Sequence, residues 1–123
     1  MGLSDAAALL ATALTPVTAG AGWILRRWGD GAFALRMRPH LVLGYAVLGL
    51  ALLHVILSAS NAGSANGIGI ACASLALAGL GLQTFSGTNL QSPGGYRLVL
   101  RRWHTALFWS IAALLAAHIL LNT

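Results

Sequence analysis

The sequence predicts an all-α membrane protein, a transmembrane up-and-down four-helix bundle. Hydrophobic residues make up 58% of its 123 residues and charged residues only 7%, which leaves too little polar surface for a water-soluble domain. Four apolar segments, each close to the roughly 20 residues that a membrane-spanning helix needs, are separated by polar connections. No stretch alternates polar and apolar residues in the way a half-buried strand does.

The four segments form one integral-membrane domain, with spans expected at about residues 3–28, 39–58, 65–85 and 100–121. The first span contains Pro16, and because proline interrupts helical hydrogen bonding we expect a kink or a late helix start there. No basic residue precedes its apolar run, and Asp5 lies where a secretory signal is positively charged. We therefore expect this segment to be retained as a span. Pro39 suits the first turn of the second span.

Positive charge is confined to one side of the predicted bundle. The seven basic residues flank the first connection or precede the fourth span: Arg26, Arg27, Arg36, Arg38, Arg97, Arg101 and Arg102. The positive-inside rule places this side in the cytoplasm, which predicts an N-out, C-out protein of a bacterial inner (cell) membrane. Without a soluble surface to carry it, the net charge of +5 does not indicate nucleic-acid binding.

The four histidines form two equally spaced pairs, His40 with His54 and His104 with His118. Fourteen residues separate each pair inside an apolar span, which is close to four helical turns and about 21 Å along the axis. In an up-and-down bundle the second and fourth spans run parallel, so His40 lies level with His104, and His54 with His118. Imidazoles facing each other from two helices at two depths suit axial ligation of two haem irons.

Other interpretations of these histidines remain open. A single histidine in an apolar helix more often packs or hydrogen-bonds between helices, which would indicate a non-haem structural or assembly protein. Intramembrane ionisable groups are nevertheless costly and usually functional, and four in matching register favour haem. Zinc is disfavoured because one ion needs ligands closer than fourteen residues along a helix. A histidine-relay proton channel lacks intramembrane carboxylates. Cys72, the single cysteine, offers neither a disulfide nor covalent haem attachment.

Small residues near the expected sites would let helix backbones approach a porphyrin, although they also serve helix packing. Gly67 and Gly81 are fourteen residues apart in the third span, and Gly44 follows His40 by one turn. The first span repeats the same interval twice, in Ala6 with Gly20 and in Ala8 with Gly22.

Haem propionates are anionic, and guanidinium groups pair well with carboxylates. The candidate partners beside His40 and His104 are Arg36, Arg38, Arg101 and Arg102. No charged group lies beside His54 and His118, where the polar candidates are Ser58, Ser60, Asn61 and Asn122.

Two segments, RPHLVLGYAVLGLALLHVILS and RRWHTALFWSIAALLAAHILL, resemble the histidine-bearing helices of transmembrane dihaem cytochromes b. The histidine interval is similar to that in the N-terminal bundle of the cytochrome b subunit of quinol–cytochrome c oxidoreductases, and the small size to that of cytochrome b561-type proteins. The resemblance covers nearly the whole chain. It implies two non-covalent b-type haems, ligated by His40 with His104 and by His54 with His118. The quinol-site motifs of the large subunit have no counterpart in these residues.

The sequence therefore predicts transmembrane electron transfer through two bis-histidine haems, with no catalytic side chain. Such ligation leaves the iron no open position, which favours electron transfer over oxygen binding. The expected partners are the lipid bilayer and either other redox subunits of a larger complex or the quinone pool. A stand-alone quinone-dependent oxidoreductase is the alternative with the same chemistry.

Overall fold

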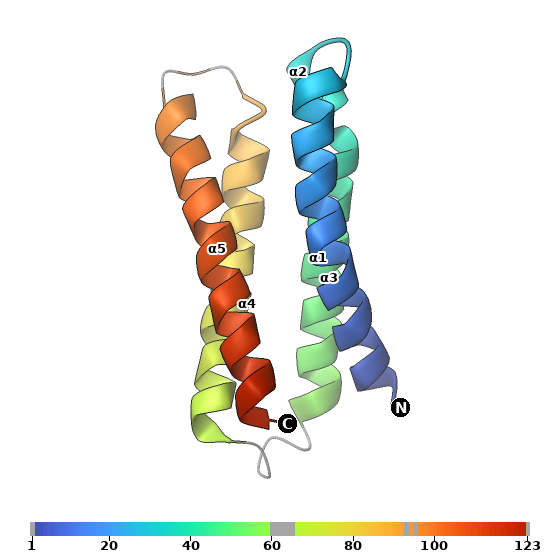
Figure 1. Cartoon of the computed structure of the whole chain (residues 1–123), viewed down its shortest axis with the longest axis vertical. Helices are drawn as coiled ribbons and strands as arrows, with labels where there is room; N and C mark the ends of the chain where they lie inside the picture. The colour runs from blue at the N-terminus through green and yellow to red at the C-terminus, as the bar shows by residue number, and fades with distance from the viewer. Residues whose placement is uncertain (1, 60–65, 93, 95, 123) are drawn as a thin grey trace.

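The computed structural model describes residues 2–59, 66–92, 94 and 96–122, and this part of the chain is all-helical, without strands (Figure 1). Its helices are α1 (Leu3–Trp28), α2 (Phe33–Arg36), α3 (Arg38–Ser58), α4 (Gly67–Asn89) and α5 (Arg97–Asn122). Four of them, α1, α3, α4 and α5, are long and apolar enough to cross a membrane. The predicted all-α architecture is confirmed, and four helices have the length and composition that the expected spans require.

The expected spans match the long helices to within four residues at every boundary. At the start of α4 the side chain of Asn66 accepts hydrogen bonds from the N–H groups of Ile68 (2.9 Å) and Gly69 (3.3 Å). This N-cap satisfies backbone donors that have no partner inside the helix. The short α2 is new, because the sequence predicted only a connection between the first two spans.

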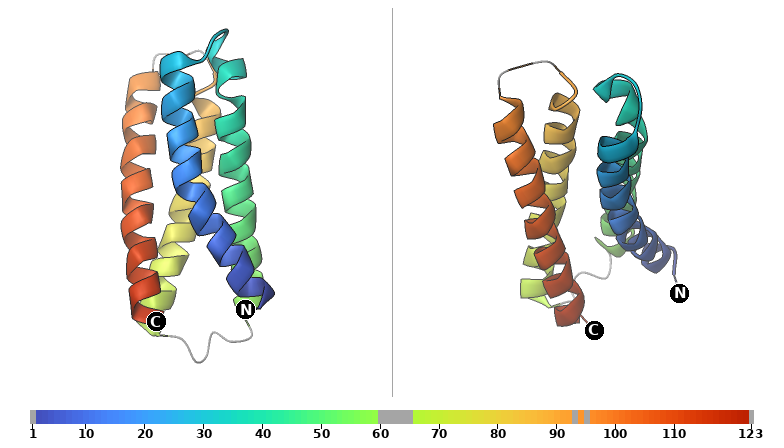
Figure 2. Two further views of the ribbon diagram at one scale, coloured as in Figure 1. Left: turned by 45° about the vertical axis from the view of Figure 1, so that its right-hand side comes forward. Right: turned by 45° about the horizontal axis from the view of Figure 1, so that its top comes forward.

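Helix α1 continues through Pro16 but changes direction along its length (Figure 2). Proline has no N–H to donate to the preceding turn, and its ring crowds the carbonyl four residues earlier. Of the two outcomes expected at Pro16, a kink or a late helix start, the structure has a bend in a continuous helix.

The four long helices form two antiparallel hairpins. Helix α1 packs along α3, and α4 packs along α5, while contact between α3 and α4 joins the hairpins. Both termini lie at one end of the bundle (Figure 1). The seven arginines occupy the opposite end, since they lie at the end of α1, in α2 and at the starts of α3 and α5.

The packed centre of the bundle is small and lies at mid-height. Among the described residues only four apolar side chains are buried, and three of these are Val47, Ala76 and Ile111. Val47 is seven residues from both histidines of α3, and Ile111 is seven from both histidines of α5. The core therefore separates an upper level, with His40 and His104 near the arginine end, from a lower level, with His54 and His118.

Candidate functional site

Each histidine donates a hydrogen bond from Nδ1 to a main-chain carbonyl on the other helix of its hairpin. The Nδ1–O pairs are His40–Thr18 (2.8 Å), His54–Ser4 (3.0 Å), His104–Gln83 (3.1 Å) and His118–Gly69 (2.9 Å). A carbonyl oxygen can only accept, so in the neutral ring Nδ1 carries the proton and Nε2 keeps its lone pair. Within the described part of the chain, Nε2 of these histidines has no hydrogen-bond partner.

The carbonyl acceptors repeat the spacing of the histidines that bind them. Ser4 and Thr18 are fourteen residues apart on α1, and Gly69 and Gln83 are fourteen apart on α4. From the first hairpin to the second, the acceptors are displaced by 65 positions and the histidines by 64. The second hairpin thus repeats the first, and each hairpin contributes one imidazole to each of the two levels.

Glycine lies where a histidine ring crosses the neighbouring helix near the arginine end. A Cβ added to Gly22 would lie 2.8 Å from Nδ1 of His40, and one added to Gly87 would lie 3.2 Å from Cε1 of His104. Both glycines follow the accepting carbonyl by four residues. A side chain at Gly22 would displace the ring, so this position needs glycine for close approach.

Hydroxyl and amide groups add second contacts to three of the Nδ1 atoms. Ser86 Oγ lies 3.0 Å from Nδ1 of His104 and donates to the Gln83 carbonyl (2.9 Å). Ser4 Oγ lies 3.0 Å from Nδ1 of His54. These contacts further restrict ring rotation.

Ser58 and Asn122, expected as propionate partners, lie instead against the histidines. Ser58 Oγ contacts Ser4 Oγ and lies 3.4 Å from Nδ1 of His54. Asn122 Nδ2 lies 3.3 Å from Nδ1 of His118 and donates to its carbonyl (2.8 Å). The other two polar candidates, Ser60 and Asn61, fall outside the described residues.

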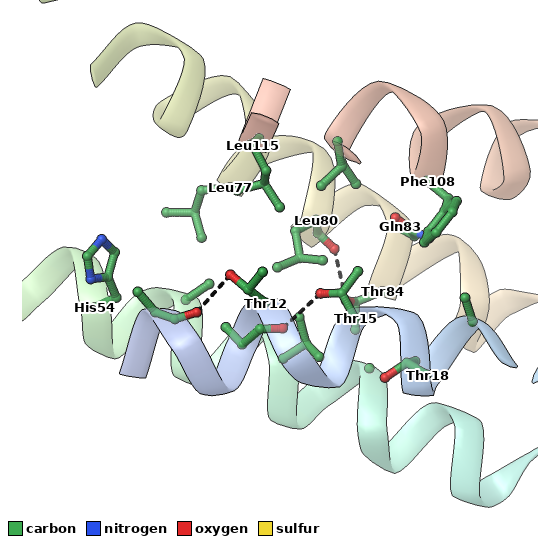
Figure 3. Close-up of a pocket in the computed structure, with 18 of the residues that line it drawn as sticks. Thr12, Thr15, Thr18, His54, Leu77, Leu80, Gln83, Thr84, Phe108 and Leu115 are labelled. Carbon is green, nitrogen blue, oxygen red and sulfur yellow. Dashed lines mark hydrogen bonds between the residues drawn. The ribbon is translucent and has the colours of Figure 1, made fainter. Parts of the chain in front are cut away.

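All four histidines line one cavity of about 260 Å³ between the two hairpins. Figure 3 shows Thr12 and Thr15 of α1 across from Leu77 and Leu80 of α4, with His54 at one end. Among the described lining residues the histidines are the only ionisable ones. The cavity is therefore a largely apolar space with imidazoles at two levels.

A second cavity of about 630 Å³ shares His40 and His104 with the first and extends to the arginine end. Three arginines line it: Arg26, Arg97 and Arg101. Four aromatic side chains also line it: Trp23, Phe33, Phe108 and Trp109. This cavity combines a flat aromatic lining with cations at its outer end.

The structure brings only part of the predicted arginine set to the cavities. Of the four candidates, Arg101 lines the second cavity, whereas Arg36, Arg38 and Arg102 line neither. Arg36 donates from Nη1 to the Gly29 carbonyl (2.8 Å). Arg26 and Arg97 were not anticipated, although their positions near the ends of α1 and α5 made them as eligible as the residues chosen.

Only some of the predicted glycines line a cavity. Gly44 lines the first cavity, and a Cβ added to it would meet nothing within 4 Å. Gly20, Gly67 and Gly81 line neither cavity, and added Cβ atoms there also meet nothing.

His40 and His104 face each other across the boundary between the hairpins. Their ring centroids are 6.1 Å apart and their planes make an angle of 72°. Two imidazoles bound to opposite sides of one metal ion, each at roughly 2 Å, have centroids about 6 Å apart. The upper pair therefore has the separation that axial ligation requires. His54 and His118 share the first cavity at the other level.

The described chain holds no group of three or more His, Cys, Asp or Glu side chains suited to a metal ion. Fold and site together define a helical protein in which four helices are long and apolar enough to cross a membrane and two of these carry paired histidines. No family model matches the sequence, and neither a curated protein nor a solved structure is significantly similar to it. Function therefore has to be inferred from the site itself.

Proposed function

We propose that this protein transfers electrons across a membrane and holds two b-type haems, one at each histidine level. The observation that carries this proposal is the anchoring of four Nδ1 atoms to helix carbonyls. This leaves four unprotonated Nε2 atoms on residues that line the cavity. Metal-ligating histidines typically donate their other ring N–H to a carbonyl in this manner, which fixes the ring and raises its basicity.

Paired ligands suit haem better than a bare metal ion. A porphyrin supplies four equatorial nitrogens, so the iron needs only two axial ligands from the protein. The 6.1 Å centroid separation of His40 and His104 supports axial ligation at the arginine end. His54 and His118 are the proposed ligands at the other level. A zinc site would need more protein ligands around one ion than each level offers.

The surroundings of the upper pair fit the rest of the cofactor. Gly44 leaves open space on the α3 side for the macrocycle. Arg26, Arg97 and Arg101 stand at the outer end of the second cavity, where guanidinium groups can pair with the propionate carboxylates. We propose these three arginines as the propionate partners. Only Arg101 belongs to the set of four that the sequence predicted.

A bound haem supplies a one-electron redox couple. The protein's own residues hold and orient the ligands, exclude water and separate the two levels by the apolar Val47, Ala76 and Ile111. With an imidazole on each side of a bound haem iron, no site would be left for dioxygen. Electron transfer is therefore favoured over oxygen chemistry.

The partners follow from the membrane setting. We propose that electrons pass between the quinone pool or a partner redox subunit and an acceptor on the opposite side of a bacterial inner membrane. The arginine end is proposed to be cytoplasmic, because positive charge is retained on that side. A stand-alone quinone-dependent oxidoreductase is the second candidate. Turnover of a quinol analogue by the isolated protein would favour it over a subunit of a larger complex.

Replacement of His54 tests the ligand assignment. His54→Ala is expected to remove about half of the bound haem, because only the lower site loses an axial ligand. The measurement is the haem-to-protein ratio of the purified variant. Leu53→Ala, at a neighbouring residue that lines neither cavity, should keep the full ratio. An unchanged ratio in His54→Ala would refute its role as a ligand.

A further inference from the structure

We propose that the haem enters sideways from the bilayer, through a slot between α1 and α5, while the contact between α3 and α4 stays closed as a hinge. This inference rests on the proposed haem-binding function. In this proposal the α1–α5 side of the cavity serves for haem entry, and the α3–α4 side holds the hairpins together.

Among the long helices, close packing joins the two hairpins on one side only. Helix α3 packs against α4, whereas α1 and α5 make no comparable contact in the described chain. A hydrogen bond of 3.0 Å between Tyr45 Oη and Thr88 Oγ1 ties α3 to α4. Opening the α1–α5 side would therefore break fewer interactions than opening the α3–α4 side.

Exposure of the lining residues places the mouth of the second cavity between α1 and α5. Its lining residues from α3 and α4 are all at least partly covered, whereas Trp23 of α1 is 53% exposed and Trp109 of α5 is 68% exposed. The other exposed lining residues also belong to α1 or α5: Arg26, Arg97, Leu98, Arg101 and Thr105.

The first cavity opens mainly on the same side. Thr12 of α1 and Ile119 of α5 are exposed residues that line it, and Val55 of α3 is the one exposed lining residue elsewhere among those described. A slot between α1 and α5 thus reaches both histidine levels. Its walls lie within the membrane-spanning helices, so the mouth faces lipid rather than water.

The arginine end offers a poorer entrance. Phe33 of α2 lines the second cavity there, and the guanidinium groups of Arg36 and Arg97 lie 5.8 Å and 5.0 Å from its ring centre. The Arg97 contact holds α2 against α5, whereas Arg36 belongs to α2 itself. A flat apolar ring would enter more easily between Trp23 and Trp109, with its carboxylates trailing toward Arg26 and Arg101.

Cross-linking of either side in the full-length chain tests this route. In a Cys72→Ala background, Ala19→Cys with Thr105→Cys allows α1 to be tethered to α5 by a flexible bismaleimide. Tyr45→Cys with Thr88→Cys allows the same tether between α3 and α4 as the matched control. Each protein is produced without haem in haem-depleted cells, and haem uptake is followed by Soret absorbance after hemin is added.

The tether across α1 and α5 should slow uptake at least about tenfold relative to the same protein before linking, because the slot can no longer widen. The tether across α3 and α4 should change the rate less than about twofold. The α1–α5 tether formed after loading should leave the haem bound, since all four proposed ligands are unchanged. Equal uptake with the slot tethered, or equal inhibition by both tethers, would overturn the lateral route while leaving haem binding established. Failure of the untethered proteins to bind hemin would overturn both the route and the proposed function.

Discussion

A histidine inside a membrane needs a partner for its ring N–H, and here helix carbonyls provide it. The carbonyl of Thr18 accepts from the N–H of Gly22 within its own helix, yet its second lone pair is free to accept from His40. A Cβ on Gly22 would lie 2.8 Å from Nδ1 of His40 and would keep the ring away from this carbonyl. Glycine at this position therefore exposes the carbonyl that fixes the ring.

Substitution of this glycine is expected to disturb one haem site. Gly22→Ala places a Cβ 2.8 Å from Nδ1 of His40, so the ring must move and the upper site should lose most of its haem, about half of the total. Gly20→Ala, where nothing lies within 4 Å, is the matched control and should bind haem normally. The measurement is the haem-to-protein ratio of the two purified variants. Equal ratios would contradict the role of Gly22.

The residue scale also shows where sequence reasoning ended. The equal spacing of the histidines is visible in the sequence, because only four such residues are present. The carbonyls that accept from the histidines, such as those of Ser4 and Gln83, cannot be identified from the sequence, because every residue carries a carbonyl. The sequence does not distinguish Gly22 from Gly20, because both repeat the fourteen-residue interval among other small residues. The face that α1 turns to α3 cannot be read from so uniform a pattern.

At the scale of elements, long apolar runs bounded by polar turns predicted the four long helices well. Helix α1 covers the expected range, residues 3–28. Helix α5 begins at Arg97 rather than residue 100, because arginine is a good helix former despite its charge. Helix α2 was missed because one turn of helix, Phe33–Arg36, is too short to show a periodic pattern.

Ile111 is the buried side chain of α5 that packs against α4 at mid-height. Ile111 is 4% exposed, and its Cγ1 lies 3.0 Å from where a Cβ on Gly79 would be. Ile111→Ala should therefore leave a void at mid-height and lower the free energy of unfolding by about 2 kcal/mol or more. Ile56→Ala removes the same atoms from a side chain that is 70% exposed and should cost much less. Denaturation in detergent, monitored by circular dichroism, compares the two, and equal losses would contradict the packing role.

The whole molecule consists of two similar hairpins facing each other across a space. The buried Val47, Ala76 and Ile111 lie at mid-height, and the histidines lie above and below them. Two planar cofactors in this space would supply the core that the described side chains do not. Binding would then also stabilise the fold, since a ligand that binds only the folded chain shifts the folding equilibrium.

The charge distribution of the whole molecule makes a separate prediction about orientation. With all seven arginines at one end, a C-terminal alkaline phosphatase fusion should be active, because that enzyme folds only outside the cytoplasm and the C-terminus lies at the opposite end. A fusion after Asp30, in the arginine-rich connection, should be inactive. The reverse pattern of activities would contradict the N-out orientation.

The most direct test of the central claim is the optical spectrum of the purified protein together with its haem content. The account predicts a reduced-minus-oxidised spectrum of b type and two haems per chain, one for each pair of imidazoles. A colourless preparation from haem-replete cells, with no such difference spectrum, would contradict it and favour a structural role for the four histidines.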